Sequence, residues 1–445
     1  MNITDLNGKK ICILGFGKEG KTMVEALEKY APDCEITIAD QNEKIFDEPP
    51  ATSHQPPANK HWLQLGTGWL QNLDKFDVII KSPGIPPSRL LTTHYKLLTT
   101  PTQIFFDSIA DSGVTVIGVT GSKGKSTTAS LIHSILKAGG RKPVAGSILV
   151  GNIGEPAISH IADAKKGTIF VMEMSSYQLM DLKSSPHIAV VTSFFPEHMD
   201  YHGSEAAYLE AKKNITRFQG DDDIVFFCAT SHGAADIAKE GNGRKIPFSG
   251  DESPVAIEKT HLIGAHNQSN IAGAFAVARH LGIDESDAIA AIKEFRGLPH
   301  RLQSLGVHHG VEWIDDAIST TPESTIAALD ALGDRVQTII LGGQDRGYDF
   351  TELGKRITTS KIETVILFPG SGQKIKEAIE KATKTVKFVE AGSMEKAVIA
   401  AKQATSQPAN QQHRIVLLST ASPSYGMFKN FEEKGDLFKK EVQRI

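Results

Sequence analysis

The residues with the clearest chemical potential lie in one turn, which reads Thr120-Gly121-Ser122-Lys123-Gly124-Lys125-Ser126-Thr127. Its glycines let backbone N–H groups face phosphate oxygens, and a helix N-terminus adds partial positive charge. Lys125 would reach the β/γ-phosphates of a nucleotide, and the Ser126 hydroxyl would hold Mg²⁺. The spacing departs from the strict P-loop because Val119 stands where the first glycine belongs. The turn predicts a nucleotide-phosphate site; the alternative is an ordinary glycine turn before a helix.

A second glycine turn lies near the N-terminus and reads Gly15-Phe16-Gly17-Lys18-Glu19-Gly20, which fits G-x-G-x-x-G. Asp40 follows twenty residues after Gly20, where an acid can bond a ribose hydroxyl. This pattern indicates a nucleotide diphosphate more securely than it indicates NAD, and an unliganded turn in a Rossmann-like fold is the alternative. A third turn, Ser82-Pro83-Gly84, ends a strand where open α/β sheets bind ligands.

Acids, histidines and amides suited to metal or nucleotide contact recur further along. Glu173 stands near the end of an apolar run and could be a second ligand of Mg²⁺, or only a surface acid. The loop 194–203 holds His198 and His202, which could bind metal or move protons, or could be solvated loop histidines. Asn267 and Asn270 share one helix face and could read a base or ribose edge.

These residues need strands and helices to position them, and the pattern predicts an α/β fold. Strands are expected at 10–14, 76–81, 114–119, 167–174 and 188–193, with loop at 41–65 and a helix opening at Lys125. Pro299 reads as a hinge. Beyond it, strand and helix alternate through 311–315, 323–332, 336–341, 374–381, 386–390, 394–403, 414–418 and 427–442, as in a doubly wound domain. We expect three domains, at 1–107, 108–298 and 299–445.

The bulk composition agrees with a globular protein of several domains. The chain has 445 residues, of which 40% are hydrophobic and 22% charged. A net charge of -4 argues against general nucleic-acid binding. No apolar run reaches the length of a membrane span, and the N-terminus has no signal-peptide pattern. Three cysteines without metal-ligand spacing suggest reduced thiols, so a cytoplasmic location is expected.

Taken together, the motifs resemble the Mur ligase family, the ATP-dependent amide-forming enzymes of peptidoglycan precursor synthesis, and within it the glutamate-adding branch. The matching residues follow the family's order across almost the whole chain. They are the turn 120–127, Gly151 to Gly154, Glu173 with 175–179, His198 to Asp200, Tyr208 with Ala211-Lys212, His266-Asn267 with Asn270, Gly297 to Arg301, Asp315-Asp316 and Phe428 to Gly435.

The resemblance implies three domains: a Rossmann-like N-terminal one for a UDP-sugar, a central P-loop ATPase-like one, and a Rossmann-like C-terminal one for an amino acid. It implies UDP-sugar contacts at Gly15, Phe16, Gly17, Lys18, Asp40, Ser82, Pro83, Gly84, Asn152 and His198. It implies ATP contacts at Gly121, Ser122, Lys123, Gly124, Lys125, Ser126, Thr127, Asn267, Asn270, Arg301 and Asp316. Arg301 and Asp316 would close over ATP when the third domain swings in.

The resemblance also implies the catalytic groups, which are Lys125, Glu173, His198 and Lys212. Lys212 matches the family's carbamylated lysine, whose CO₂ adduct ligates magnesium. Two Mg²⁺ ions are expected on Ser126, Glu173, His198 and carbamylated Lys212. The amino acid is expected on Thr320, Arg346, Ser424 and Phe431.

The chain departs from the family pattern in its C-terminal part. Ile318 stands where the family usually has a lysine, and Arg346 replaces the lysine that would hold the amino acid's side-chain carboxylate. An arginine fork can pair with a carboxylate, but with different geometry. The ATP chemistry is unaffected by these departures, whereas the amino-acid pocket is.

The implied activity is ATP-dependent addition of D-glutamate to UDP-N-acetylmuramoyl-L-alanine through an acyl phosphate, by a monomer that binds neither nucleic acid nor membrane. The same ligation with L-glutamate and a folylpolyglutamate-like ligation are the alternatives within the family. Outside it stand a nucleotide-binding switch, which leaves His198 and Lys212 without a role, and an NAD-dependent oxidoreductase, which leaves the turn 120–127 unexplained.

Overall fold

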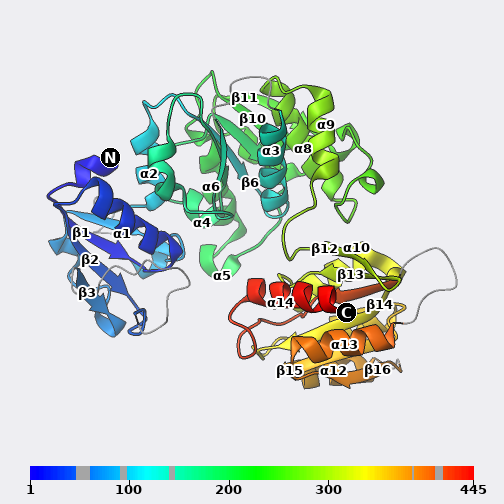
Figure 1. Ribbon diagram of the computed structural model, residues 1–445. Helices are drawn as coiled ribbons and strands as arrows, with labels where there is room; N and C mark the ends of the chain where they lie inside the picture. The colour runs from blue at the N-terminus through cyan, green and yellow to red at the C-terminus, as the bar shows by residue number, and fades with distance from the viewer. Residues whose placement is uncertain (47–60, 91–97, 140–145, 383–384, 406–413) are drawn as a thin grey trace. The chain divides into compact units, whose positions relative to one another are not determined.

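The computed structural model describes residues 1–46, 61–90, 98–139, 146–382, 385–405 and 414–445 (Figure 1). Three sheets of mostly parallel strands organise these residues, with helices between most successive strands. The chain forms two compact units. The first comprises Met1–Pro254 and Gln268–Ile292, and the second comprises Val255–Asn267 and Lys293–Ile445. Each predicted domain range contains one sheet, while the predicted boundaries themselves stay a prediction.

The first sheet is parallel throughout its described strands. Its order is β3 (Trp62–Leu65), β2 (Glu35–Asp40), β1 (Lys10–Leu14), β4 (Val78–Lys81) and β5 (Leu98–Thr99). Helices α1 (Lys18–Tyr30) and α2 (Pro101–Ile109) bury Met23, Leu27 and Phe105 in the core on one side. The turns after β1 and β4 lie where the strand order reverses, which is where such sheets bind ligands.

The expectation of loop over 41–65 is wrong at its C-terminal end. Residues Trp62–Leu65 form β3, which pairs with β2 in parallel from Thr37↔Trp62 to Asp40↔Leu65. As an edge strand β3 buries little, and the Trp62 side chain is 73% exposed. Its four residues lack the buried apolar run by which β1 and β4 were found. The rest of the expected loop, 47–60, lies outside the described residues.

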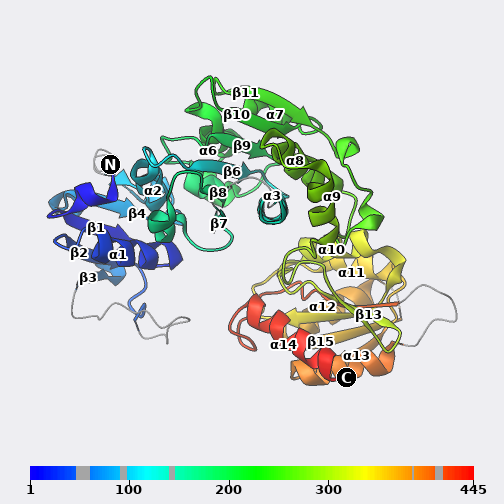
Figure 2. The same cartoon turned by 45° about the horizontal axis from the view of Figure 1, so that its top comes forward.

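The second sheet carries the turn 120–127. Its order is β11 (Arg244–Phe248), β10 (Ile224–Cys228), β9 (Ile188–Val191), β6 (Thr115–Thr120), β8 (Ile169–Glu173) and β7 (Ser147–Gly151), again parallel. The expected helix after the turn is α3 (Lys125–Ala138), which contacts β6, β7 and β8. Helices α6 (Glu205–Arg217) and α7 (His232–Ala238) pack near β6, β9 and β10 (Figure 2). Two further helices follow, α8 (Asn267–His280) and α9 (Glu285–Glu294).

The second unit has the doubly wound architecture expected from its alternating pattern. The sheet order is β12 (Gln303–His308), β13 (Val311–Asp315), β17 (Arg414–Leu418), β14 (Val336–Gly343), β15 (Thr364–Gly370) and β16 (Lys387–Glu390). Only β12 is antiparallel to its neighbour within the described sheet. Helices α13 (Met394–Ala404) and α14 (Phe431–Arg444) pack on one face, with Trp313, Phe368 and Phe438 between them and the strands.

The opposite face of this sheet is covered by α10 (Pro322–Leu332), α11 (Thr351–Thr358) and α12 (Gly372–Lys381). Strands β12 and β15 and helix α11 had no counterpart among the expected elements. The last helix begins at Phe431 rather than near 427, because the Asn430 side chain caps it by accepting a hydrogen bond from Glu433 N at 2.9 Å.

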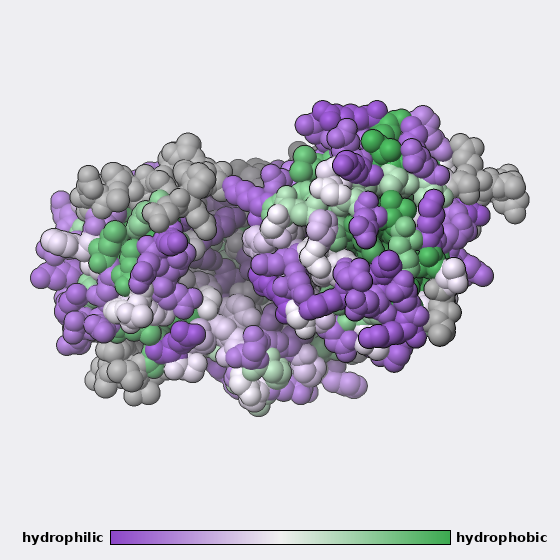
Figure 3. All heavy atoms as spheres, turned by 90° about the horizontal axis from the view of Figure 1, so that it is seen from below, coloured by the Kyte–Doolittle hydropathy of each residue, from purple (hydrophilic) through white to green (hydrophobic). Residues whose placement is uncertain are grey.

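None of the helices in the described ranges is both long and apolar enough to cross a membrane. On the face drawn in Figure 3, hydrophilic side chains predominate among the described residues, with apolar ones gathered in small groups.

Candidate active site

The turn after β6 leads into α3 and has the glycine backbone conformation that a phosphate cradle would need. Gly121 and Gly124 have φ values of +153° and +88°, and Gly124 is the N-cap of α3. A Cβ on Gly124 would stand 2.3 Å from Asn270 Oδ1, so only glycine fits between the turn and α8. The Lys125 ammonium donates to Gly121 O at 3.0 Å and Ser122 O at 2.9 Å. The ammonium therefore lies against the backbone of the turn, where the phosphates of a nucleotide would bind.

The end of β9 supports this cradle with hydroxyl groups that sequence reasoning did not single out. Thr192 Oγ1 donates to Lys123 O at 2.6 Å, and Ser193 Oγ accepts from Lys123 N at 2.9 Å. Ser122 Oγ lies 3.1 Å from Tyr208 Oη on α6. Because β9 neighbours β6, its carboxyl end lies beside the turn. The hydroxyl residues directly after the apolar run 188–191 are the signal that could have found them.

Lys212 lies against the same turn. Its side chain comes from α6 and is 1% exposed. Its Nζ donates to Gly121 O at 2.9 Å, and to Thr120 Oγ1 at 3.4 Å. Burial first, and then the charge of Lys125, lower the pKa of Lys212 well below its usual range. A neutral amine is the form that attacks CO₂, so this environment suits carbamylation.

Glu173 ends β8 and is 1% exposed. Its Oε1 accepts a hydrogen bond from Asn152 Nδ2 at 2.8 Å, while its Oε2 is buried with no hydrogen-bond partner. A buried carboxylate oxygen without a donor is costly unless something else binds it. Its charge also acts on Lys212. The orphaned oxygen therefore fits a divalent cation at this end of β8.

His198 precedes the short helix α5 (Met199–His202) with left-handed φ and ψ of 58° and 38°. Burial lowers the pKa of its ring, which also feels the charges of Glu197, Lys125 and Lys212. His198 therefore lies within electrostatic reach of Lys125 and Lys212. His202 is buried behind it, with Nε2 3.0 Å from Ser176 Oγ, and burial lowers its pKa to about 4.

A metal site built from three or more histidine, cysteine, aspartate or glutamate side chains does not occur within the described ranges. The predicted ligand set contains only two such residues, Glu173 and His198. Its other members are the Ser126 hydroxyl and a modified Lys212, so the set remains a prediction.

The turns after β1 and β4 meet at the edge of the first sheet. Ser82 Oγ donates to Gly15 O at 2.8 Å. Asp40 Oδ2 accepts from Phe16 N at 2.7 Å and its Oδ1 from Asn42 N at 2.8 Å. The carboxylate expected to bond a ribose thus also fixes the glycine turn.

A pocket of about 150 Å³ opens beside these turns. Its lining residues are Gly15, Asp40, Gln41, Trp69, Gly84, Ile85, Pro86 and Arg89. Three of the predicted sugar-nucleotide residues therefore share one cavity. Trp69 and Arg89, an aromatic ring and a cation suited to a base and a phosphate, were missed because they stand apart from the glycine motifs.

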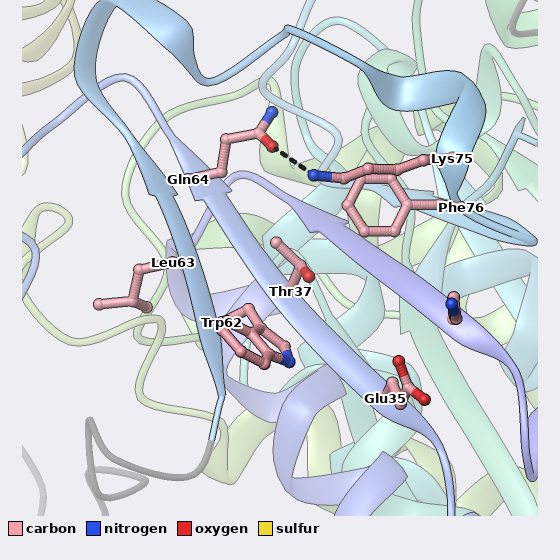
Figure 4. A pocket seen from close by; sticks show the side chains of 8 residues that line it. Glu35, Thr37, Trp62, Leu63, Gln64, Lys75 and Phe76 are labelled. Carbon is pink, nitrogen blue, oxygen red and sulfur yellow. Dashed lines mark hydrogen bonds between the residues drawn. The ribbon is translucent and has the colours of Figure 1, made fainter.

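A second pocket on the first domain, of about 310 Å³, is lined by residues outside the predicted set (Figure 4). Thr37 and Glu35 come from β2, and Trp62 and Gln64 from β3. The Lys75 ammonium lies 3.4 Å from Gln64 Oε1 and 4.9 Å from the centre of the Phe76 ring.

The predicted residue Lys18 and its neighbour Glu19 make contacts between the first and second sheets, whereas Asn152 bonds within the second sheet. Lys18 Nζ donates to Gly154 O at 2.6 Å. Asn152, besides its side-chain contact, donates from its backbone N to Glu173 O at 3.0 Å. Neighbouring Glu19 accepts from Gln178 Nε2 at 2.9 Å. The turn 15–20 is therefore attached to the strand ends that carry Glu173.

In the second unit, Asp316 lies directly after β13 and is 2% exposed. It accepts from Leu302 N at 3.2 Å and Ser419 Oγ at 2.8 Å, while burial raises its pKa to about 6. Beside it, Asp315 Oδ2 lies 2.7 Å from His300 Nδ1. Asn267, Arg301 and Asp316 belong to the second unit, and their part in ATP binding stays a prediction.

The predicted amino-acid residues gather on loops at the carboxyl ends of β13, β14 and β17. Backbone bonds join these loops: Ala421 N donates to Ser319 O, and Gln344 N to Pro423 O. The Arg346 guanidinium is exposed and lies 5.8 Å from the Tyr425 ring centre. Ser424 Oγ is buried with no hydrogen-bond partner, which suits a ligand. Phe431 is the first residue of α14, so unlike the other three it lies on a helix.

Family models match the chain in two places: the Mur ligase middle domain at residues 119–278, and the Mur ligase glutamate ligase domain at residues 300–421. A UDP-N-acetylmuramoyl-L-alanine–L-glutamate ligase of Salinispora tropica is 35% identical over 100% of this chain and 99% of its own. A UDP-N-acetylmuramoylalanine–D-glutamate ligase of Streptococcus agalactiae is 33% identical over 98% and 97%. The chain belongs to the Mur ligase family.

Solved Mur ligases share the fold of this chain. The UDP-N-acetylmuramate–alanine ligase of Thermotoga maritima superimposes with a TM-score of 0.56 at 16% identity, over 98% of this chain and 99% of that one. The MurF ligase of the same organism in complex with ADP gives 0.54 at 16% identity, over 100% and 97%. The Escherichia coli protein FolC, also ADP-bound, gives 0.54 at 15% identity, over 82% and 99%.

This Mur ligase is therefore an ATP-dependent enzyme that forms an amide bond. The finding confirms the expected family, fold and reaction class. It also rules out the two alternatives outside the family, a nucleotide-binding switch and an NAD-dependent oxidoreductase.

Proposed function

We propose that this Mur ligase joins glutamate to UDP-N-acetylmuramoyl-L-alanine in peptidoglycan precursor synthesis, through an acyl phosphate. The observation that carries the chemistry is the orphaned Glu173 Oε2 at the end of β8, in the same unit as the phosphate cradle and electrostatically coupled to buried Lys212. The choice of substrates rests on the full-length relatives, which are named for adding glutamate to this sugar nucleotide.

The chemistry must solve the problem that a carboxylate is a poor acyl donor, because its leaving group would be oxide. The alanyl carboxylate attacks the γ-phosphorus of ATP and displaces ADP. The amino group of glutamate then attacks the acyl phosphate, and the tetrahedral intermediate expels inorganic phosphate and loses a proton. Lys125 neutralises charge on the transferred phosphoryl group, and the backbone N–H groups of the turn 121–127 hold its oxygens.

Magnesium fits the donor set of Ser126, Glu173, His198 and a carbamate on Lys212, and when bound it would offset the negative charge of the phosphates. The carbamate forms when the neutral Lys212 amine attacks CO₂ and loses a proton. The result is a carboxylate, which can ligate Mg²⁺, in place of the amine. The buried Glu173 oxygen and the lowered pKa of Lys212 both support this assignment.

The substrate sites are assigned by domain. We place the sugar nucleotide at the turns 15–18 and 82–84, with Asp40, Asn152 and His198, and we add Trp69 and Arg89 because they line the same pocket as Gly15 and Asp40. We place glutamate at Thr320, Arg346, Ser424 and Phe431. The exposed guanidinium of Arg346 can pair with a carboxylate in a bidentate way.

The handedness of glutamate is a separate question, and the prediction is D-glutamate. The Streptococcus relatives are named for that enantiomer at 32–33% identity. L-glutamate is the second candidate, and two observations favour it. Two relatives at 35% and 34% identity are named for the L form, and Ile318 replaces the usual lysine beside the predicted pocket.

The deciding experiment measures phosphate release with ATP, Mg²⁺, UDP-N-acetylmuramoyl-L-alanine and one glutamate enantiomer at a time. The enzyme should release no phosphate with ATP alone, and should release phosphate when both other substrates are present. A clear preference for L-glutamate would overturn the stereochemical prediction and leave the ligase assignment intact. Inactivity with both enantiomers would remove glutamate as the substrate.

The remaining assignments follow the family's general behaviour. We infer that the enzyme acts as a monomer in the cytoplasm, and that it binds neither nucleic acid nor membranes. Size-exclusion chromatography with light scattering tests the first point, since a monomer should give about 48.1 kDa.

A further inference from the structure

We propose that Tyr201 is a positioning residue that holds the sugar-nucleotide turn 82–86 against the helix that follows His198. The inference rests on the proposed function, because it concerns how that reaction's sugar nucleotide is held. It starts from a contact that the mechanism above does not use. The Tyr201 hydroxyl lies 2.6 Å from Pro83 O and 3.0 Å from Ile85 O.

The contact restrains the same turn that lines the ligand pocket. Gly84 and Ile85 line the pocket of about 150 Å³, while the carbonyls of Pro83 and Ile85 turn toward Tyr201. A phenol has one proton and can donate to one of the two carbonyls at a time, so either bond restrains the same turn. The two carbonyls flank Gly84, so a bond to either one limits the freedom of a residue that lines the pocket.

An ion pair between a buried lysine and a partly exposed aspartate also holds this turn. The Lys81 ammonium is 0% exposed, donates to Ile85 O at 3.0 Å, and lies 2.8 Å from Asp181 Oδ2. Asp181 follows α4 (Ser176–Leu179) in the sequence and belongs to the central domain, whereas Lys81 ends β4 of the first domain. Two independent side chains thus hold the turn 82–86 to the central domain.

Through its ring, Tyr201 also connects to His198, which we propose is catalytic. Tyr201 is the third residue of α5, and His198 is the N-cap of this helix. Its ring packs on Tyr177 with centroids 4.1 Å apart, and Tyr177 in turn lies 5.2 Å from the His198 ring. Rings in contact transmit a shift of one to the next, because packed interiors have little free volume. A turn held correctly for the sugar nucleotide therefore also sets the position of His198.

The test is Tyr201→Phe, which keeps the ring stack and removes only the hydroxyl. The matched control is Tyr30→Phe, since the Tyr30 hydroxyl is buried without a hydrogen-bond partner and lies outside the site. We expect the KM for UDP-N-acetylmuramoyl-L-alanine to rise about 3- to 10-fold in Tyr201→Phe, the effect of one hydrogen bond. The KM for ATP should stay within twofold, and Tyr30→Phe should leave both constants unchanged.

Calorimetric titration with UDP-N-acetylmuramoyl-L-alanine, without ATP or glutamate, separates this inference from the proposed function. The inference stands if Tyr201→Phe binds the sugar nucleotide several-fold more weakly than the wild type. It is overturned if the two affinities agree within twofold, or if the KM values for ATP and sugar nucleotide rise together, as a general structural defect would cause. If the wild type binds the sugar nucleotide but releases no phosphate with either glutamate enantiomer, only the proposed glutamate ligation is contradicted.

Discussion

At the scale of single residues, two lysines at one turn play different parts because their surroundings differ. Lys125 reaches the cradle from the start of α3 and is half-buried, whereas Lys212 is 1% exposed and packs on the Tyr208 ring at 4.8 Å. Burial lowers the pKa of Lys212 well below its usual range. The first lysine is suited to remain a cation beside phosphates, and the second to become a nucleophile toward CO₂.

Replacing Lys125 with alanine should lower kcat/KM for ligation more than about a hundredfold, because one transition-state charge contact is lost. The control is Lys137→Ala at the exposed end of the same helix, which should retain activity. The measurement is initial phosphate-release rate, alongside the melting temperature of each variant. Activity of Lys125→Ala within a few-fold of the wild type would contradict the P-loop assignment.

Replacing Lys212 with alanine should abolish ligation, and added formate or acetate should restore part of it by supplying the missing carboxylate. Lys213→Ala is the matched control, because the adjacent side chain pairs with Glu210 at 2.6 Å on the helix surface. The readout is phosphate release across a formate titration in CO₂-depleted buffer. Full activity of Lys212→Ala in that buffer would mean that no carbamate is needed.

At the scale of elements, the site depends on strand ends and on the helices packed behind them. The clearest case lies in the second unit, where the His300 ring and Asp315 at the end of β13 form a buried pair beside α14. Lys434 of α14 is 1% exposed and donates to Thr420 Oγ1 at 2.6 Å, and burial lowers its pKa to about 8. Polar groups thus fix α14 to the loops that carry the predicted glutamate contacts.

The His300–Asp315 pair should make stability depend on pH in one direction. Its hydrogen bond with Asp315 raises the pKa of His300 above the usual 6.5, against the opposing effect of burial. A raised folded-state pKa means that the contribution is complete below pH 6.5 and is lost as pH rises through the folded value. His300→Gln should therefore cost about 1–3 kcal/mol in free energy of unfolding at pH 6, and less at pH 9.

The free energy of unfolding of the wild type and of His300→Gln is measured in urea. Four pH values between about 5.5 and 9 are enough to show whether the difference between the two proteins changes. The control is His261→Gln, whose exposed side chain should give a small difference at every pH. A constant cost of His300→Gln across the range would show that the pair makes no pH-dependent contribution.

At the scale of the whole molecule, polar contacts join the first two sheets in one compact unit. Lys18 to Gly154, Glu19 to Gln178, Lys81 to Asp181 and Tyr201 to Pro83 all cross between them. These contacts hold the turns 15–20, 82–86 and 120–127, where we propose the sugar nucleotide and the ATP phosphates bind, within one unit. In the proposed reaction, this arrangement would bring the substrate carboxylate and the γ-phosphate of ATP together in one orientation.

Asp181→Leu should destabilise this unit by on the order of 3 kcal/mol, because it leaves the buried Lys81 ammonium without its carboxylate. Adding Lys81→Met to the same protein should recover most of the loss, since a buried ion pair can be replaced by apolar groups. Thermal and urea unfolding of both variants measure this. Asp163→Ala, on a surface pair, is the control. A double variant no more stable than Asp181→Leu would contradict the account.

The sequence by itself determined the chemistry and most of the elements that carry it. Buried β-branched runs and glycine turns are local signals, so β1, β6, β8 and the turns after β1 and β6 could be read from neighbouring residues. The edge strand β3 could not, because its four residues are half exposed and its partner β2 lies more than twenty residues away in the chain.

The tertiary structure decided which chemically capable residues meet. Glu173 and Lys212 stand 39 positions apart, and only the order of β8, β6 and α6 brings both to the cradle. That Glu173 Oε2 lacks a donor, that Lys212 is buried, and that Tyr201 reaches Pro83 across 118 positions follow from packing rather than from any motif. The physical reason is that burial and hydrogen-bond partners are properties of the folded environment, while residue type and spacing state only what a side chain could do there.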